Sequence, residues 1–217
     1  MTERILLRYP HASSFQRWHM RGRLRLCPYA KLNRHLTGAE SILDVGCGFG
    51  HLAWHLADSK PGLRYFGTDI DDKKISLAKG SVTPESPAHP EFLIGDAPAL
   101  NRLPKRFGNI VFLDVLYLMP WEAQKRMLEW AFGRLAPGDE SVVVVKTMDR
   151  AEGISGFRAV VEEWIMVRLL RRTVSSGTIN GARSVSDYLE FAHGLGFRGE
   201  TESLATFNPS TILRFHR

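Results

Sequence analysis

Short apolar runs alternate with longer mixed stretches over residues 41–145. The runs predict buried strands, because they are rich in β-branched residues and bounded by glycine, proline or acidic turns. The expected strands are 41–45, 63–68, 91–94, 109–113 and 141–145. The stretches between them predict helices over 51–59, 72–79 and 121–135. Alternating strands and helices are typical of an α/β fold with a doubly wound, mostly parallel sheet.

Both ends of the chain depart from this alternation. Residues 12–36 have a helical pattern, and we expect Gly22 and Pro28 to interrupt it. After the fifth strand, residues 151–183 contain an amphipathic stretch that predicts a long helix over 157–172. The last part predicts a helix over 186–195 and two strands near 197–203 and 211–215. These two strands would suit an antiparallel hairpin at the C-terminal end of the sheet.

Charge is distributed unevenly along the 217 residues, which together carry a net charge of +6. Residues 1–35, called the arm below, hold eight Lys and Arg residues against Glu3 alone, so the arm carries +7 and the rest −1. Such an arm suits phosphates, an acidic carrier protein or an anionic membrane surface, and otherwise acts only as a solubilising helix. We expect one domain over 1–217, with the arm and residues 151–183 as additions to it.

Cysteine content and hydropathy narrow the class of protein further. The chain has only Cys27 and Cys47, with no zinc-type spacing of Cys and His, so we expect no metal site. It contains no apolar run long enough to span a membrane and no secretory leader pattern. A cytoplasmic protein fits these features best.

The first predicted strand continues into the segment Ile42-Leu43-Asp44-Val45-Gly46-Cys47-Gly48-Phe49-Gly50. We call residues 46–50 the glycine loop. Glycines between a strand and a helix allow a sharp turn and close approach to an anionic ligand. The spacing G-x-G-x-G differs from the G-x-G-x-x-G of dinucleotide-binding loops and argues against an NAD-dependent oxidoreductase. The string from Leu43 to Gly50 resembles motif I of the class I, Rossmann-like S-adenosylmethionine-dependent methyltransferases.

Further segments resemble the later motifs of that family and follow in the same order. They are 65–71, 92–97 and 107–116. Asp69 stands 19 positions after Gly50, close to the spacing of about 20 expected for a ribose-binding acid. The resemblance implies S-adenosylmethionine as cofactor, with Asp44 under its methionine end and Asp96 at the adenine amino group. The implied cofactor-binding residues are Asp44, Gly46, Cys47, Gly48, Gly50, His51, Asp69, Ile70, Asp96, Ala97 and Asp114.

Several of these residues have a simpler structural interpretation. Asp44 could have no role beyond capping the next helix or holding the loop. Cys47 could be a small packed residue and not a nucleophile. His51 and His55 are four positions apart, but no carboxylate partner completes a metal-binding motif. We place His51 near the cofactor's carboxylate end and expect His55 to be structural or exposed.

Methyl transfer from a sulfonium needs mainly alignment of the acceptor with the methyl group. The candidates on the acceptor side are Tyr117, after the fourth strand, and Lys146 and Asp149, at the end of the fifth. Tyrosine is a weak base at neutral pH, because its reference pKa is about 10, so Tyr117 would rather orient the acceptor. Residues 114–120 also echo the (Asp/Asn)-Pro-Pro-Tyr motif of nitrogen-methylating enzymes, but both prolines are missing.

The sequence therefore predicts methyl transfer to a small-molecule acceptor that is lipid-like, polyketide-like or carrier-bound. The apolar residues within 151–183 suggest a lid over such an acceptor. One alternative is an RNA methyltransferase that uses the basic arm, although no RNA-binding module is visible. Another is a protein that binds S-adenosylmethionine without catalysis. The sequence leaves the acceptor and the oligomeric state open.

Overall fold

The parallel strands assemble as the alternating pattern predicts. The computed structural model describes residues 1–138, 140–148, 182–204 and 210–217, and these residues form one seven-stranded sheet. Its order is β3-β2-β1-β4-β5-β7-β6. The strands are β1 (Ser41–Val45), β2 (Arg64–Asp69), β3 (Glu91–Ile94), β4 (Asn109–Leu113), β5 (Val142–Thr147), β6 (Arg198–Leu204) and β7 (Ser210–His216).

Among the described strands, antiparallel pairing occurs only at the edge of the sheet formed by the C-terminal strands. Strands β1 to β5 pair in parallel, whereas β7 pairs antiparallel with both β5 and β6. The antiparallel hairpin predicted for the tail is thus confirmed, and β7 is the strand that joins it to the sheet. The doubly wound fold is confirmed as well, and its strand order reverses between β1 and β4.

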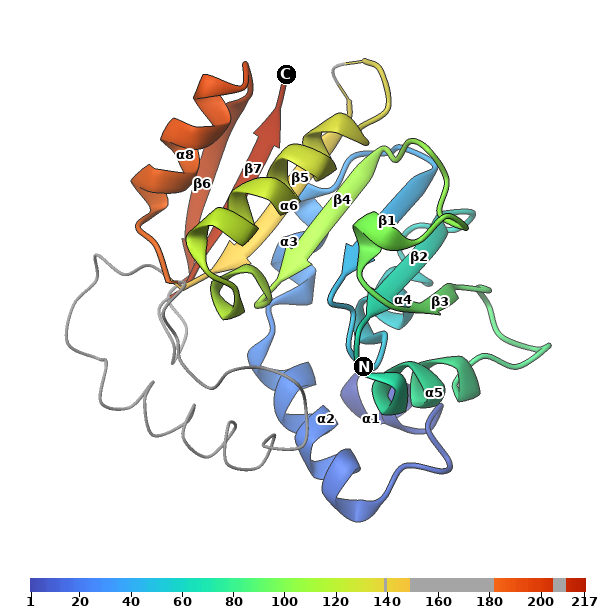
Figure 1. Cartoon of the computed structure of the whole chain (residues 1–217). Coiled ribbons are helices and arrows are strands. Elements are labelled where there is room, and N and C mark those ends of the chain that lie inside the picture. Colours follow the sequence, from blue (N-terminus) through green and yellow to red (C-terminus); the bar gives the residue numbers. More distant parts are fainter. Residues whose placement is uncertain (139, 149–181, 205–209) are drawn as a thin grey trace, which may run out of the picture.

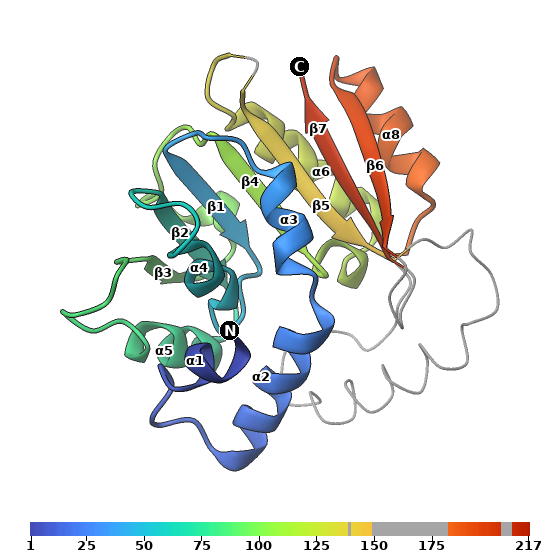
Figure 2. The same cartoon turned by 180° about the vertical axis from the view of Figure 1, so that it is seen from behind.

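Helices cover both faces of the sheet (Figures 1 and 2). Helices α6 and α8 lie on one face, and α3 and α4 lie on the other. The described α-helices are α1 (Thr2–Leu6), α2 (Ser14–Leu26), α3 (Tyr29–His35), α4 (His51–Leu56), α5 (Asp72–Gly80), α6 (Trp121–Gly133) and α8 (Val185–Gly194). Two 3₁₀ turns, η1 (Ala97–Ala99) and η2 (Leu116–Leu118), follow β3 and β4.

The strand side chains alternate between two hydrophobic cores. Ile42 and Val144 belong to the core under α1 to α5, and Leu43 and Val143 belong to the core under α6 and α8. All four are fully buried. Burial on both faces explains why these strands are continuously apolar and not alternating in sequence.

The arm forms three helices, which differ from the predicted pattern in two respects. Helix α2 continues through Gly22, so the predicted interruption there is wrong. Glycine costs a helix about 1 kcal/mol relative to alanine. A capping box between Ser13 and Gln16 and the buried Met20 offset that cost. The interruption at Pro28 is confirmed, because α3 begins only after it. Helix α1 was not predicted at all.

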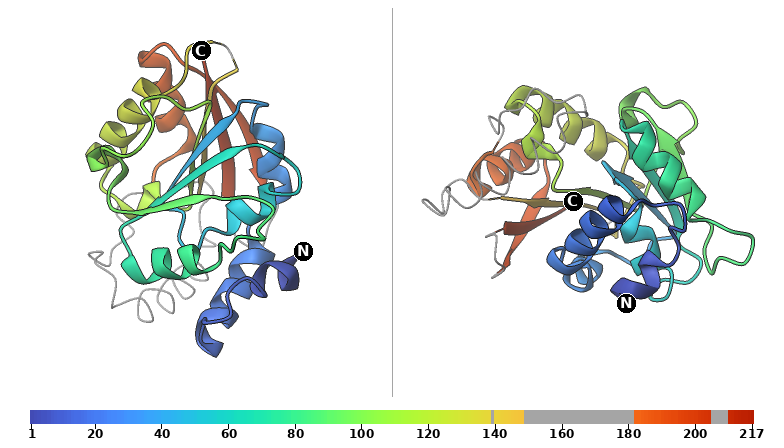
Figure 3. Two further views of the ribbon diagram at one scale, coloured as in Figure 1. Left: turned by 90° about the vertical axis from the view of Figure 1, so that its right-hand side faces the viewer. Right: turned by 90° about the horizontal axis from the view of Figure 1, so that it is seen from below.

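The first two helices of the arm, α1 and α2, pack at the end of the sheet where the parallel strands finish (Figures 1 and 3). The Tyr9 hydroxyl donates a 2.6 Å hydrogen bond to the carbonyl of Phe49 in the glycine loop. The Arg17 guanidinium donates to four backbone carbonyls between Leu6 and Ala12 and thereby fixes the turn from α1 to α2. Arg21 forms two hydrogen bonds with Glu3. The arm is therefore packed against the domain.

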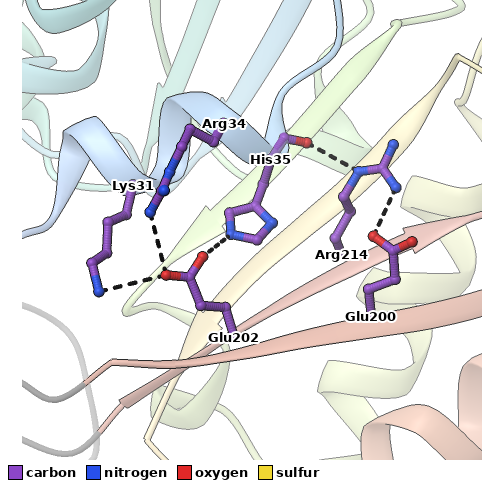
Figure 4. Close-up of polar contacts among 6 residues, drawn as sticks. All are labelled: Lys31, Arg34, His35, Glu200, Glu202 and Arg214. Carbon is purple, nitrogen blue, oxygen red and sulfur yellow. Dashed lines mark hydrogen bonds and ion pairs between the residues drawn. The ribbon is translucent and has the colours of Figure 1, made fainter.

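A polar network fastens the end of the arm to the C-terminal hairpin (Figure 4). The Glu202 carboxylate on β6 accepts a hydrogen bond of 2.8 Å from His35 and pairs with Lys31 and Arg34, all from α3. Arg214 on β7 donates to the backbone carbonyl of His35. These contacts join residues almost the whole chain apart and hold α3, which directly follows α2, against the hairpin.

The predicted helix over 157–172 and Asp149 lie outside the described residues, as does most of the predicted lid over 151–183. Within the described part of the chain, no helix is long and apolar enough to cross a membrane.

Candidate functional site

The glycine loop is fixed to the end of the neighbouring strand β2. The backbone N–H groups of Gly46 and Cys47 both donate to the Thr68 carbonyl, at 2.8 and 2.9 Å. Gly46, Gly48 and Gly50 all have positive φ, which only glycine adopts without strain. A Cβ atom on Gly50 would lie 2.4 Å from Cζ of Phe92, so this position also lacks space for a side chain.

Asp69 connects the glycine loop to the turn after β2. Its Oδ2 accepts from the N–H of Gly48 and its Oδ1 accepts from the N–H of Asp71, each at 2.9 Å. Asp71 in turn caps α5. Each Asp69 oxygen accepts one backbone hydrogen bond in this arrangement, so each retains acceptor capacity. The carboxylate thus both holds the loop and presents oxygens beside it.

The residues predicted at the adenine end follow β3, beside Asp69, and differ in their exposure to solvent. The N–H of Gly95, after β3, donates to the Asp69 carbonyl at 2.9 Å and brings the two strand ends together. Asp96 is exposed, Ala97 is buried, and the Ile70 side chain is 66% exposed. A large apolar side chain exposed next to an acceptor-lined strand end is suited to covering the flat face of a base.

Asp44 is a buried carboxyl group with one oxygen unpaired. Only 2% of the residue is exposed. Its Oδ2 accepts a short hydrogen bond from the Tyr65 hydroxyl, whereas Oδ1 has no hydrogen-bond partner among the described residues. The pKa of Asp44 is raised to about 7, mainly by burial. The hydrogen bond from Tyr65 acts to lower this pKa, and the nearby charge of Asp69 acts to raise it. A buried, unpaired carboxylate oxygen is costly unless a ligand donates to it.

Two histidines flank the Phe49 ring in the glycine loop. The His51 ring stacks against Phe49 with centroids 5.8 Å apart, and His19 from α2 packs edge-on at 5.9 Å. The Nε2 atoms of both histidines are buried without a hydrogen-bond partner in the described chain. Burial lowers the pKa of His51 to about 3, and burial together with the charge of Arg23 lowers the pKa of His19. Both imidazoles are therefore neutral near pH 7.

Asp114, Arg23 and Lys146 form a charged group at the ends of β4 and β5. The Asp114 carboxylate accepts from Arg23 Nη1 at 2.9 Å and from Lys146 Nζ at 2.5 Å. Burial acts to raise the pKa of Asp114, but these two cations hold it below its usual range. Asp114 also has a φ of 59°, the only positive φ at a non-glycine residue in the described chain. Strain of this kind is typical of positions that present a side chain at a functional site.

The remaining candidates occupy different surroundings. Tyr117 lies in η2 after β4 and is half-buried. Cys47 packs against β2 at Gly67, and burial raises the pKa of its thiol well above the usual value. His55 is half-buried and packs on the Tyr29 ring, 5.4 Å between centroids. In the part of the chain that the structure describes, no group of His, Cys, Asp and Glu could hold a metal ion.

Sequence reasoning missed Arg23 and His19. Both lie on one side of α2, four residues apart, and contact Asp114 and the ring of Phe49. The i, i+4 spacing of two polar residues in the arm was the available signal. It was hidden because the whole arm is basic, so no arginine stood out from its neighbours.

The fold and the glycine loop are similar to those of the class I S-adenosylmethionine-dependent methyltransferases. A family model described as "Methyltransferase domain" matches residues 42–138, which extend from β1 to the turn before β5. The matched stretch is less than half of the chain and is similar to this family, whose cofactor is S-adenosylmethionine.

Two curated relatives match parts of the chain. A 2-heptyl-1-hydroxyquinolin-4(1H)-one methyltransferase of Mycobacteroides abscessus is 29% identical over 104 residues, which are 48% of this chain and 45% of that protein. A release factor glutamine methyltransferase of Aliivibrio fischeri is 46% identical over 48 residues, 22% of this chain and 17% of that protein. The matches thus cover less than half the length of these relatives.

Solved structures share the fold over nearly the whole chain. Magnesium protoporphyrin IX methyltransferase from Synechocystis PCC 6803, with bound SAH, has a TM-score of 0.64 and 18% identity, covering 100% of this chain and 93% of that one. The mitomycin 7-O-methyltransferase has a TM-score of 0.68 and 20% identity, covering 97% of this chain and 59% of that one. At these identities the likeness shows the fold alone.

Proposed function

We propose that the protein transfers a methyl group from S-adenosylmethionine to a small-molecule acceptor. The observation that carries the proposal is the buried Asp44 carboxyl group. Its Oδ1 has no hydrogen-bond partner among the described residues. Asp44 lies two residues before the glycine loop, which is hydrogen-bonded to β2. A buried acceptor beside a backbone cradle fits a ligand that brings its own ammonium group.

The residues of the glycine-loop side fit the remaining parts of the cofactor. The Asp69 oxygens, each with acceptor capacity left, would take the ribose hydroxyls, and Asp96 with Ala97 would meet the adenine. Ile70 would cover the base. Gly46, Cys47, Gly48 and Gly50 would let the backbone approach the ligand, and the neutral His51 would lie near its amino-acid end.

The bound cofactor would supply an activated methyl group: the carbon–sulfur bond electrons would stay on sulfur, an acceptor lone pair would form the new bond, and any acceptor proton would pass to solvent. The protein's task is alignment and exclusion of water. Lys146 and Asp114 lie at the ends of β5 and β4, on the far side of β1 from Asp69. We assign this side to the acceptor, with Lys146 and Tyr117 orienting it and Asp114 fixing Lys146. Asp149, predicted just after β5, is included as a further acceptor-side residue on the basis of the sequence alone.

We propose an apolar organic molecule as the acceptor, in line with the lipid-like or polyketide-like class that the sequence suggests. The relatives and structural neighbours support this, since they include methyltransferases named for a heptyl hydroxyquinolone, mitomycin and magnesium protoporphyrin. A carrier-bound form of the acceptor, or delivery at an anionic membrane surface, would give the exposed arginines of the arm a partner.

The arm itself weakens the RNA alternative. Arg17, Arg21 and Arg23 are held by backbone carbonyls, Glu3 and Asp114 respectively. Arg4 pairs with Asp58, and Lys31 and Arg34 pair with Glu202. Six of the eight basic side chains of the arm are thus committed within the protein. A phosphate-binding surface needs its cations free to replace counterions.

Calorimetric titration with S-adenosylhomocysteine tests the cofactor part of the proposal. Wild-type protein should bind it, and Asp69→Ala should weaken binding by about 100-fold or more, because two ribose hydrogen bonds to a charged group are lost. Asp72→Ala is the matched control: this acid is exposed in the first turn of α5 and should leave affinity unchanged. Wild-type protein that binds no nucleoside would refute the proposal.

Release of S-adenosylhomocysteine in the presence of a panel of quinolones, phenols and aromatic acids tests catalysis. Turnover with any of them excludes the alternative of a non-catalytic cofactor-binding protein. Tight nucleoside binding without release for the whole panel would favour that alternative.

A further inference from the structure

Arg23 stands out because it brings an arm residue into the interior of the site. It donates to Asp114, which is 91 residues away in the chain, and its side chain remains 36% exposed. Its positive charge lowers the pKa of Asp44, His51 and His19, although burial is the larger influence on all three. Geometry places the guanidinium beside the glycine loop, because His19, one turn away on α2, packs on the Phe49 ring, and Val115, next to Asp114, lies against Gly46.

The group of charges that Arg23 joins is not balanced. Asp114 supplies one negative charge and is kept ionised, whereas Arg23 and Lys146 supply two positive charges. Lys146 is only 8% exposed. An excess positive charge in a mostly buried place is costly unless a ligand brings an anion.

Arg23 also retains donors that an anion could use. Among the hydrogen bonds of the described residues it makes one, from Nη1 to Asp114. A guanidinium has five N–H donors in a planar fork, which matches a carboxylate. The pair with Asp114 holds the fork in place, so little side-chain freedom is lost when a ligand binds.

Asp44 provides the complementary acceptor for the other end of such a ligand. Its unpaired Oδ1 suits an ammonium group, and the neutral His51 and His19 can donate from Nε2 or leave it as an acceptor. Asp44 lies on β1, and the Arg23 fork is held by Asp114 at the end of the neighbouring strand β4. An acceptor for a cation and a donor fork on adjacent strands form the pattern that recognises an α-amino acid.

We propose that Arg23 binds the carboxylate of the cofactor's amino-acid end, opposite Asp44 at the ammonium. The inference rests on the proposed function and makes the arm part of the cofactor site. Helix α2 must then be docked before the amino-acid end is fully held, whereas the nucleoside end needs only residues 41–97.

Two ligands separate this role from a merely structural one. S-adenosylmethionine and decarboxylated S-adenosylmethionine share the nucleoside, the sulfonium and the ammonium, and differ in the carboxylate. Calorimetry at pH 7.5 should show that wild-type protein prefers the carboxylated ligand by roughly 10- to 100-fold, as expected for a charge-assisted hydrogen bond. Arg23→Gln should abolish this preference while leaving the affinity for the decarboxylated ligand within about twofold. Asp114 keeps Lys146 as a partner in this variant.

Arg25→Gln is the matched control, because it lies on the same helix and is exposed. It should retain the wild-type preference, and both variants should show wild-type thermal unfolding. Equal loss of affinity for both ligands in Arg23→Gln, or no preference in wild-type protein, would overturn the inference. Failure of wild-type protein to bind either ligand would instead overturn the proposed function.

Discussion

The two sides of the site are built in opposite ways. The glycine-loop side comes from one stretch, residues 41–71, in which backbone N–H groups and Asp69 close a compact turn between neighbouring strands. The arm side consists of helices whose decisive contacts are side chains, such as Arg23 with Asp114 and His35 with Glu202. On the glycine-loop side, position 50 has no space for a side chain. The arm side depends instead on charge pairs between side chains.

This difference has consequences for stability and for function. A backbone turn with positive φ cannot be rearranged locally, so changes there act on the fold. Charge pairs that are partly exposed contribute little to stability, so changes there act on binding. The predictions below separate the two sides by the size and the kind of effect.

The largest effect is expected in the glycine loop. Gly50→Ala should lower the free energy of unfolding by about 3 kcal/mol, because a Cβ at positive φ would also collide with Phe92. Gly48 has a φ of 57° but open space around its Cα. Gly48→Ala should therefore cost only about 1 kcal/mol. Urea unfolding measures both, and similar costs would show that the Phe92 contact is unimportant.

The next effect concerns the buried hydrogen bond under the loop. Tyr65→Phe should destabilise the protein by about 1–3 kcal/mol, because the Asp44 carboxyl group loses its partner inside the protein. The pKa of Asp44 should rise further, since the hydrogen bond from Tyr65 lowers it. Unfolding measured at pH 6 and pH 8 checks both points, and the loss should be larger at pH 8.

The pKa of Asp44 also predicts a pH dependence of binding. The folded value of about 7 lies above the usual 3.8, so ionisation of Asp44 lowers stability as pH rises through 7. The ionised form is the one that accepts an ammonium. Affinity for S-adenosylhomocysteine should therefore increase by up to about tenfold from pH 6 to pH 8. Asp44→Asn should remove this dependence, and a pH-dependent Asn variant would assign the effect to another group.

The smallest effect is expected where the arm meets the hairpin. The hydrogen bond from His35 lowers the pKa of Glu202, so this group contributes stability above its usual value of 4.5 and loses that contribution as pH falls below it. Glu202→Gln should cost less than about 1 kcal/mol at pH 7, because the pairs are partly exposed. Hydrogen exchange of α3 should nevertheless increase. Unchanged exchange would show that the other arm contacts suffice.

Local backbone patterns were predictable from the sequence. The bounds of β3 and β4 agree with the expected strands, and the glycine loop follows from residues close together in the chain, although the sheet itself pairs distant residues such as Ile42 and Asn109. The strand bounds and the loop depend on local backbone geometry, whereas the parallel order follows from the alternation of strands and helices, because a crossover helix returns the chain parallel to the previous strand.

Only the tertiary structure placed the arm. The sequence showed eight basic residues without distinguishing Arg23 from Arg25, and it predicted a break at Gly22 that packing of Met20 and Leu24 overrides. The pairing of Arg23 with Asp114 depends on where α2 docks, which is decided by burial and by contacts with residues 49 and 202. Contacts between distant segments leave no periodic pattern in the sequence. The burial and charge pairing that stabilise them exist only when the sheet and the arm are folded together.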